Sequence, residues 1–514
     1  MTQLLPNFLG GRWIAGTGTG TPLFDPVLGD ELVRVDASGL DLAAAFAFSR
    51  QEGGAALRAM TFVERAELLD RIAKLLQANR DAYFEIATAN SGTVRNDSAV
   101  DIDGAIYTLV TYSKLGKTLG ATRYLKDGEP VSLAKDALFQ SQHIQVPTEG
   151  LALFINAFNF PAWGLWEKAA PALLAGVPVV AKPATSTAWL THRMVADVVD
   201  AGLLPAGALS IVCGSSAGLQ DALQELDVLS FTGSAETAAV IRRHPAVSAR
   251  SVRANIEADS INSAVLLPGN EVGTPAFEAL VKEVAREMTT KSGQKCTAIR
   301  RIFVPAPLFD EVGQAVSARL AKTVVGNPRS EAVRMGSLVS RAQLQAVTEG
   351  IALLQQSAET LYDGDGKAPV DADPAVACCV APTLLGIRDS DAVSNVHDHE
   401  VFGPVATLIP YRDLDHAHAM VRRGKGSLVA SLYGNDPAVI ARSTLALAPS
   451  HGRIHVVTPA SAGVHSGHGN VMPQSLHGGP GRAGGGEELG GLRALNFYSR
   501  RVAVQASPEV ILSL

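Results

Sequence analysis

Short apolar runs alternate with helical patterns over residues 151–243, and this alternation restricts the possible folds more than any other feature of the chain. The runs predicted to be strands are 151–155, 177–182, 209–213 and 227–232. The segments predicted to be helices are 162–175, 186–201, 216–223 and 235–243. Strands that alternate with helices in this way form a parallel, doubly wound sheet, which binds its ligand at the carboxyl ends of the strands.

A second block of the same kind begins near Cys296 and continues to about Val457. Its predicted strands are 301–305, 404–410, 427–433 and 453–457. A chain of 514 residues can bury more than one core, so we expect two α/β domains, with Cys296 in the second. Ahead of the first block, residues 1–38 are expected to form short strands and turns, and helices are predicted over 61–87 and 96–115.

Three segments lie outside these blocks. Residues 126–146 are polar and extended, and we interpret them as a protruding hairpin, while residues 497–505 are predicted to form a final strand. Residues 458–491 are rich in glycine, histidine and serine, which suits either a flexible linker or an ordered loop over an active site. The varied sequence of residues 487–493 favours the ordered loop.

Composition narrows the class of protein. The net charge of −6 argues against general nucleic-acid binding, and 47% hydrophobic with 18% charged residues is typical of an ordered soluble chain. The 4 cysteines, two of them adjacent at Cys378 and Cys379, do not suggest a disulfide framework and predict a cytoplasmic location. We expect no secretory signal at the N-terminus and no membrane-spanning run.

Cys296 lies in a turn between a predicted helix and a predicted strand. The helix begins at Thr274-Pro275, repeats apolar residues at helical spacing and breaks at Gly293. A ligand could reach a thiol in such a turn, and we expect Lys295 and nearby arginines to favour the reactive thiolate. The alternative is an inert, buried cysteine.

Strand ends in the first block carry candidate ligand-binding residues. Lys182 ends one strand, Gly214 follows another, and Gly233-Ser234 opens a helix after a third. Backbone N–H groups at such helix starts can bind a phosphate, although ordinary turns and a solvated lysine would give the same pattern. No GxGxxG fingerprint follows a strand here, so the usual dinucleotide signature is absent.

Polar side chains at other strand ends suit chemistry on a carbonyl group. Asn159 follows the strand 151–155, where its amide could donate to an oxyanion or cap a helix. Lys168 lies about two helical turns beyond Pro161, near the same helix face. Glu257 follows a strand-like run and could be a general base or a surface charge.

Several of these residues belong to a series of motifs that occur in a fixed order. The motifs are Asn159-Phe160-Pro161, Lys182-Pro183, Phe-Thr-Gly-Ser at 231–234, Glu257, Gly-Gln-Lys-Cys at 293–296 and Glu-Val-Phe-Gly-Pro at 400–404. Each is weak alone, but the series resembles the aldehyde dehydrogenase superfamily across nearly the whole chain. The resemblance implies a Rossmann-like cofactor-binding domain (1–125 and 150–256), an α/β catalytic domain (257–462) and a small β oligomerisation element (126–149 and 488–514).

The resemblance also implies catalytic roles. Cys296 would be the nucleophile that adds to the aldehyde, and Asn159 with the backbone N–H of Cys296 would form the oxyanion hole. Loss of hydride would leave a thioester on Cys296, and Glu257 would activate the water that releases a carboxylic acid. Lys168 matches a family lysine that assists proton movement. No metal is expected, since 397–400 and His465 with His468 are interpreted as polar loop residues rather than zinc ligands.

A nicotinamide cofactor is the implied hydride acceptor. Its predicted binding residues are Ile155, Phe158, Lys182, Thr185, Gly214, Gly233, Ser234, Glu400 and Phe402. Many NAD-preferring members carry a glutamate where this chain has Thr185, and that carboxylate would repel a 2′-phosphate. Thr185 therefore predicts a preference for NADP, with NAD less favoured.

Two departures from the family pattern affect the aldehyde tunnel. Phe158 replaces the familiar tryptophan of the oxyanion motif, and a run that begins at His477-Gly478-Gly479 replaces the usual Phe-Gly-Gly signature. We expect both changes to reshape the tunnel and to leave the chemistry intact.

The detailed sequence resembles a sub-branch of the superfamily. Segments 156–161, 163–168, 257–260, 286–289 and 477–490 look like those of dehydrogenases that oxidise CoA-thioester semialdehydes after ring opening of epoxidised aromatic-CoA compounds. The chain ends at Leu514 without a second enzyme, which favours the benzoyl-CoA branch and 3,4-didehydroadipyl-CoA semialdehyde as the substrate. A phenylacetate-pathway semialdehyde and a general aliphatic aldehyde remain alternatives.

Two further interpretations of the chain remain open. An acylating dehydrogenase would release acyl-CoA, although the presence of Glu257 favours hydrolysis to the acid. A noncatalytic protein on the same scaffold would not need Cys296, Glu257 and Asn159. The family resemblance also implies a homodimer, formed through the hairpin and the C-terminal strand, and a tetramer stays open.

Overall fold

Two seven-stranded sheets organise the computed structural model, which describes residues 2–392 and 395–514. The first sheet has the order β12 (Arg253–Glu257), β11 (Val228–Thr232), β8 (Ala152–Ile155), β9 (Val179–Lys182), β10 (Leu209–Ile211), β2 (Asn7–Leu9) and β3 (Arg12–Ile14). Its first five strands are parallel, and the N-terminal pair joins them in antiparallel fashion. The α/β fold class predicted from the strand–helix alternation is therefore confirmed.

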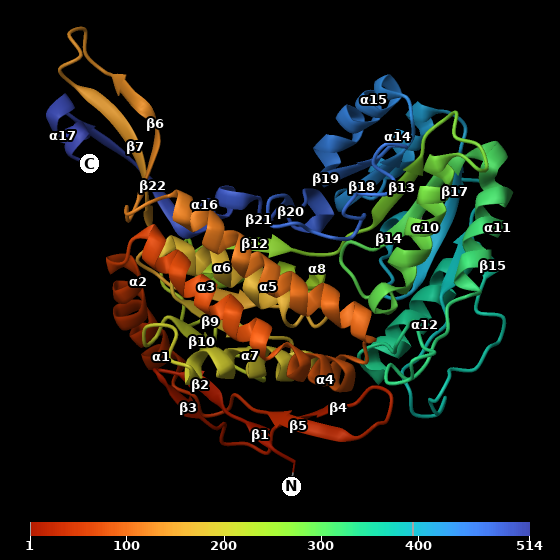
Figure 1. Cartoon of the computed structure of the whole chain (residues 1–514), viewed down its shortest axis with the longest axis horizontal. Coiled ribbons are helices and arrows are strands. Elements are labelled where there is room, and N and C mark those ends of the chain that lie inside the picture. Colours follow the sequence, from red (N-terminus) through yellow and green to blue (C-terminus); the bar gives the residue numbers. More distant parts are fainter. Residues whose placement is uncertain (1, 393–394) are drawn as a thin grey trace.

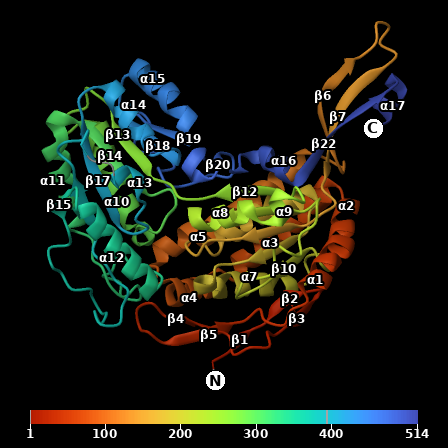
Figure 2. The same cartoon turned by 180° about the vertical axis from the view of Figure 1, so that it is seen from behind.

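The second sheet forms a separate lobe (Figures 1 and 2). Its order is β15 (Glu359–Tyr362), β16 (Thr383–Gly386), β17 (Val405–Tyr411), β14 (Ile299–Pro305), β13 (Asn262–Leu266), β18 (Ser427–Tyr433) and β19 (His451–Val457). All neighbours are parallel except β15, which pairs in antiparallel fashion with β16.

Helices cover both faces of the first sheet. Ala152 and Phe154 of β8 belong to one hydrophobic core, and the alternate residues Leu153 and Ile155 belong to another. The first core is closed by α3 (Phe62–Ala78), α5 (Arg95–Thr118), α6 (Trp163–Ala175) and α7 (Ala188–Asp200), and the second includes residues of α1 (Leu42–Phe48) and α8 (Ala235–Arg243). Burial on both faces explains why the strands are continuously apolar instead of alternating.

Three local predictions were wrong. The helix predicted over 61–87 is two helices, because Asn79 leaves helical geometry and donates its amide to Asp197 Oδ2 at 3.0 Å, and α4 (Arg80–Ser91) begins after it. Residues 216–223 form turns instead of a helix, since Gly218 adopts a φ of +78°. Phe497 belongs to the short helix α16 (Leu495–Tyr498), and the last strand, β22 (Ser499–Ala506), starts two residues later.

The predicted hairpin projects from the body of the molecule (Figure 1). It consists of β6 (Leu125–Ser132) and β7 (Gln140–Pro147), and β22 pairs along the whole of β7 to complete a three-stranded sheet. The chain ends beside this sheet in α17 (Pro508–Ser513). Both outer strands, β6 and β22, keep an unpaired edge within the described residues.

The glycine-rich segment 458–491 is ordered and lies between the two large sheets. It contains β20 (Leu476–Gly478) and β21 (Glu487–Leu489), which pair with each other. Backbone hydrogen bonds join it to the end of β12, from Ala258 N to Ala483 O and from Gly486 N to Ile256 O, both at 3.0 Å. None of the described helices combines the length and apolar content that a membrane crossing requires.

Candidate active site

The carboxyl ends of the first sheet bring several predicted residues into one row. Ile155 of β8 lies opposite Lys182 of β9 and next to Phe231 of β11, while Thr232 lies opposite Glu257 of β12. Because the strands are parallel, side chains that are distant in sequence meet at a single edge of the sheet.

Cys296 follows α10 (Pro275–Thr289) and the turn η3 (Thr290–Gly293), and it precedes β14. The turn has three consecutive residues with positive φ, of +53° at Lys291, +54° at Ser292 and +67° at Gly293. A side chain at Gly293 would lie 2.2 Å from the Gly403 carbonyl oxygen, so this position requires glycine. Asn262 donates to the Cys296 carbonyl at 2.7 Å, which fixes the turn from the other side. Such tightly held, strained backbone is common at functional sites.

The four residues predicted to be catalytic line one small buried cavity. Cys296, Glu257, Asn159 and Lys168 all contribute to its walls, although they come from different segments of the chain. The Asn159 amide makes no hydrogen bond within residues 2–392 and 395–514, so its N–H groups are available to a ligand. This cavity contains a sulfur nucleophile, a carboxylate and an amide donor, which is the set that acyl transfer requires.

The predicted thiolate is not supported by the electrostatics. Lys295 points away from Cys296 and donates to both carboxylate oxygens of Glu287, at 2.8 and 2.7 Å. Burial and the nearby negative charge of Glu257 raise the pKa of Cys296 well above the ordinary thiol value. Burial and the charge of Glu257 therefore favour the neutral thiol, whose proton needs an acceptor before the sulfur can attack.

Lys168 belongs to a buried cluster that contains more carboxylates than cations. Its ammonium group contacts Glu167 and lies 3.7 Å from Glu488 Oε1. Burial would lower the pKa of Lys168, but Glu167, Glu488 and Glu257 outweigh it and raise the pKa. Burial raises the pKa of Glu167, and Lys168 only partly offsets that effect. The cluster can therefore hold an extra proton near Glu257.

Sequence reasoning missed His477 as a site residue. Its Nε2 lies 2.9 Å from Glu257 Oε2, and its ring packs edge-on against Trp163 with the centroids 5.4 Å apart. Atoms of His477, Glu257 and Cys296 lie within 4.8 Å of one another. The available signal was the departure from Phe-Gly-Gly, which we interpreted only as a change of tunnel shape. Glu167 and Glu488 were missed too: they lie in segments 163–168 and 477–490, which we used only to identify the sub-branch.

The residues predicted to bind the cofactor lie along the same sheet edge. Lys182 is buried and has no ion-pair partner in the described chain, and burial lowers its pKa. Thr185 donates to the Gly214 carbonyl at 3.2 Å, which brings those two predicted positions together beside Lys182. Ser234 accepts from Thr237 N at 3.3 Å as the N-cap of α8, directly after Gly233. An unpaired buried cation and a capped helix start fit a phosphate-bearing ligand.

Glu400 and Phe402 approach this edge from the second lobe. The ring of Phe402 packs edge-on against that of Phe158, with the centroids 5.7 Å apart. Glu400 accepts from Ser260 N at 2.9 Å, and burial raises its pKa to about 7. The aromatic contact joins the end of β8 in the first lobe to a loop of the second lobe.

The histidines considered for a metal site have other partners. His397 Nδ1 lies 2.8 Å from a guanidinium nitrogen of Arg301, a cation that would repel a metal ion. His468 Nδ1 lies 2.5 Å from Ser431 Oγ, while His465 contacts His455 at 3.1 Å. Neither group therefore directs several free donors toward one point.

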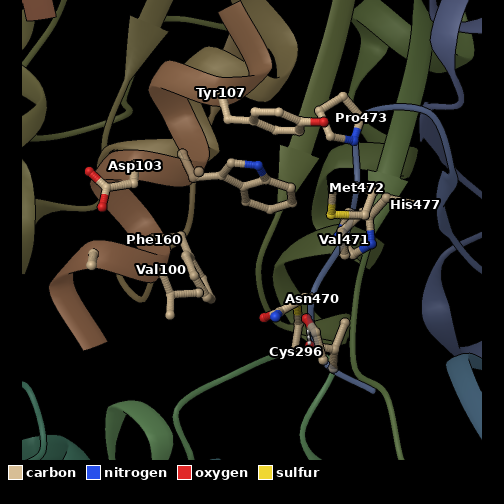
Figure 3. Close-up of a pocket in the computed structure, with 15 residues that line it drawn as sticks. Val100, Asp103, Tyr107, Phe160, Cys296, Asn470, Val471, Met472, Pro473 and His477 are labelled. Atoms are coloured by element: carbon tan, nitrogen blue, oxygen red, sulfur yellow. Dashed lines mark hydrogen bonds between the residues drawn. The ribbon is translucent and has the colours of Figure 1, made fainter. Parts of the chain in front are cut away.

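A larger cavity of about 300 Å³ leads to Cys296 (Figure 3). Val100, Asp103 and Tyr107 of α5 form one side of it, and residues 469–473 with His477 form the other. The described lining is mostly apolar, and it includes no lysine or arginine. This arrangement suits an uncharged, extended organic group with its reactive end at the sulfur.

Comparisons with known proteins identify the family and the fold of this chain. The model of the aldehyde dehydrogenase family matches residues 13–504. A relative from Aromatoleum evansii, 3,4-dehydroadipyl-CoA semialdehyde dehydrogenase, is 58% identical over 477 residues and 93% of each chain. Two solved structures share the fold: lactaldehyde dehydrogenase from Escherichia coli (TM-score 0.84, 20% identity, 98% of this chain and 99% of that one) and HpcC from Thermus thermophilus (TM-score 0.86, 21% identity, 98% and 93%).

Proposed function

The chain belongs to the aldehyde dehydrogenase family, and on that premise we propose that it oxidises 3,4-didehydroadipyl-CoA semialdehyde to the carboxylic acid, with NADP as hydride acceptor, in benzoyl-CoA degradation. The meeting of Cys296, Glu257 and Asn159 in one cavity carries the proposal of aldehyde oxidation. The 58% identity to the Aromatoleum evansii enzyme supports the choice of substrate.

The proposed reaction starts with a proton transfer from the Cys296 thiol to Glu257. The sulfur then adds to the aldehyde carbon, and the new oxyanion accepts hydrogen bonds from the Asn159 amide and the Cys296 backbone N–H. The residues near Lys182 and Thr185 would hold NADP, which would supply the hydride acceptor for this carbon. Glu167 takes up or returns the proton held by Glu257, and the Lys168 ammonium group beside it assists by stabilising the carboxylate, because the two form the adjoining buried charge cluster.

Hydrolysis then releases the acid. The carbonyl carbon of the Cys296 thioester is attacked by water, Glu257 accepts the water proton, and the sulfur leaves. The position of Glu257 beside Cys296 supports water as the acceptor, since attack by a CoA thiolate would need no such base. Release of free acid without added CoA would exclude the acylating alternative.

Two features support the choice of NADP. Lys182 is buried without a counterion in the described chain, and a 2′-phosphate would supply one. Thr185 is close enough to Gly214 to lie on the same ribose-facing edge, and it places no negative charge there. Thr185→Glu should therefore shift kcat/KM from NADP toward NAD by about 10- to 100-fold, the range that 1.4–2.8 kcal/mol of charge repulsion gives. An unchanged ratio would exclude this explanation of cofactor choice.

The CoA portion of the substrate would remain outside the cavity. A space of about 300 Å³ whose described lining includes no lysine or arginine suits the six-carbon chain better than a nucleotide with several phosphates. The CoA group would then affect KM more than kcat. We propose to compare the free and CoA-linked forms of adipic semialdehyde with each nicotinamide cofactor. Equal kcat/KM for both forms would favour a general aliphatic dehydrogenase, and loss of turnover with both would overturn the proposed function.

The remaining assignments are part of the same proposal. Residues 1–125 and 150–256 would bind the cofactor, residues 257–462 would carry the thiol, and residues 126–149 with 488–514 would form a homodimer. Exposed apolar side chains on the projecting sheet support self-association: Val131, Leu133, Leu138, Phe139 and Val502. The free state of all described cysteines supports a cytoplasmic location. Sedimentation of a variant with charged residues at Leu138 and Val502 would test the dimer.

A further inference from the structure

We propose that His477 is a positioning residue for Glu257. Its imidazolium orients the carboxylate toward Cys296 and sets the pH range in which that carboxylate can accept the proton of the hydrolytic water. The inference rests on the proposed function, because it assumes that Glu257 is the base in thioester hydrolysis.

Geometry places the His477 imidazole directly against the Glu257 carboxylate. Its Nε2 lies 2.9 Å from Glu257 Oε2, and the two side chains are only 2% and 4% exposed. His477 Nε2 and the other carboxylate oxygen of Glu257, Oε1, have no aligned hydrogen-bond partner in the described chain. The His477–Glu257 contact is therefore an ion pair, and Oε1 remains free to face a reacting group. His477 and Cys296 also line the same cavity, which puts the charge pair beside the path of the substrate.

The surrounding fold holds the imidazole in place. His477 lies opposite Glu488 in the β20–β21 pair, and its ring packs edge-on against Trp163. Gly478, the next residue, has a φ of +134°, and a side chain there would lie 2.0 Å from the Gly486 carbonyl oxygen. The glycines therefore let the backbone of β20 and β21 approach closely. This close packing places His477 next to the end of β12.

The charges around Glu257 explain how the imidazole affects the protonation of that carboxylate. The groups that face the pair are Lys168 and Glu167 of α6, Glu488 of β21 and the Cys296 thiol. Burial alone would raise the pKa of Glu257, but His477, Lys168 and Cys296 outweigh it and lower the pKa. Burial would lower the pKa of His477, but Glu257 outweighs it and raises the pKa. Both groups are thus stabilised in their charged forms.

The competing explanation is that His477 only fills space against Trp163. Phenylalanine would preserve an aromatic ring in the same pocket while it removes the charge and the polar contact. Glutamine would retain a neutral N–H donor near the position of Nε2 and remove only the charge. The two variants therefore separate packing, orientation and charge.

The decisive measurement is the pH dependence of thioester hydrolysis. Wild-type enzyme, His477→Phe and His477→Gln would be mixed with the CoA-linked form of adipic semialdehyde and NADP⁺, and the Cys296 acyl-enzyme would be followed by rapid quench and intact-mass spectrometry from pH 5.5 to 9. We expect the hydrolysis rate of the wild-type enzyme to change little with pH over this range. Both variants should show an acid limb shifted up by about 1 to 3 pH units, since loss of a neighbouring opposite charge raises a carboxyl pKa by that amount. At high pH, where Glu257 is ionised in both variants, His477→Gln should hydrolyse the acyl-enzyme faster than His477→Phe.

The outcomes are distinguishable. A His477→Phe profile that stays parallel to the wild-type profile, whether slower or not, would show that the ring only packs and would overturn the inference. Thermal unfolding of each variant identifies a folding failure, and in that case the His477→Gln profile decides alone. Failure of the wild-type enzyme to form or hydrolyse an acyl-enzyme would instead overturn the proposed function.

Discussion

Two buried lysines flank the Cys296 turn, and they differ in how their charges are balanced. Lys295, on the side of the second sheet, binds both oxygens of Glu287 at 2.8 and 2.7 Å. Lys168, on the side of the first sheet, faces Glu167 and Glu488, and Glu257 adds a further negative charge.

The comparison distinguishes an ion pair that stabilises the fold from a charge cluster that takes part in the reaction. A lysine that is hydrogen-bonded to both oxygens of one buried carboxylate holds the fold in place, because loss of either partner leaves a buried, unpaired charge. A cation shared among several carboxylates leaves protons that can move, and one oxygen each of Glu167 and Glu257 lacks a hydrogen-bond partner in the described chain. The first cluster should therefore determine stability, and the second should determine rate.

The largest expected effect comes from the sulfur between the two clusters. Cys296→Ala should lower aldehyde-dependent NADPH formation by about 10⁴-fold or more, because no other group can form the covalent intermediate. NADP⁺ binding, measured by fluorescence titration, should be unchanged. Cys379→Ala is the matched control, since that half-buried thiol lies outside the site. Substantial turnover by Cys296→Ala would contradict the whole assignment.

Glu257→Gln tests the chemical cluster directly. Removal of a positioned general base costs about 10²- to 10⁴-fold, so steady-state turnover should fall in that range. The acyl-enzyme should accumulate after a burst of NADPH, which stopped-flow absorbance and mass spectrometry would detect. Glu278→Gln, a change on the exposed side of α10, is the control. Unchanged turnover would remove Glu257 from its proposed role.

Matched lysine substitutions sharpen the contrast between the clusters. Lys295→Met should lower the free energy of unfolding by about 3–5 kcal/mol, because it leaves Glu287 buried without its hydrogen-bonded partner. Lys168→Met should lower the free energy of unfolding less, since Glu167, whose pKa burial raises to about 8, can bind a proton from solvent and lose its charge. The same substitution should slow hydrolysis more. Denaturant unfolding and single-turnover rates would measure the two quantities. If both variants lost the same unfolding free energy and hydrolysed the thioester at the same rate, the two clusters would not differ in role.

Glu400 gives the smallest expected effect. Burial raises its pKa from 4.5 to about 7, so the folded protein binds this proton more tightly than the unfolded chain. Its contribution to stability is therefore complete below about pH 4.5 and is lost as the pH rises through about 7. Glu400→Gln should reduce the drop in unfolding free energy between pH 5.5 and 8, measured with denaturant. The exposed substitution Glu349→Gln should leave that drop unchanged.

Local patterns in the sequence predicted which strands and helices exist better than they predicted where each one begins and ends. Apolar runs found the strands because a strand buried on both faces is continuously hydrophobic, as β8 and β9 are. The same signals missed the break at Asn79, where a side-chain hydrogen bond to Asp197 competes with the helix. They also predicted a helix over 216–223, where Gly218 adopts a left-handed conformation.

By itself, the sequence determined the α/β class, the order of the motifs and the identities of Cys296, Glu257, Asn159 and Lys168 as candidates. Only the tertiary structure decided that Lys295 turns away from the thiol and that His477 contacts Glu257. Periodicity and motifs report on neighbours within a few turns of chain. The contact between residues 257 and 477 depends on how a glycine-rich loop packs between two sheets, and no local pattern specifies that packing.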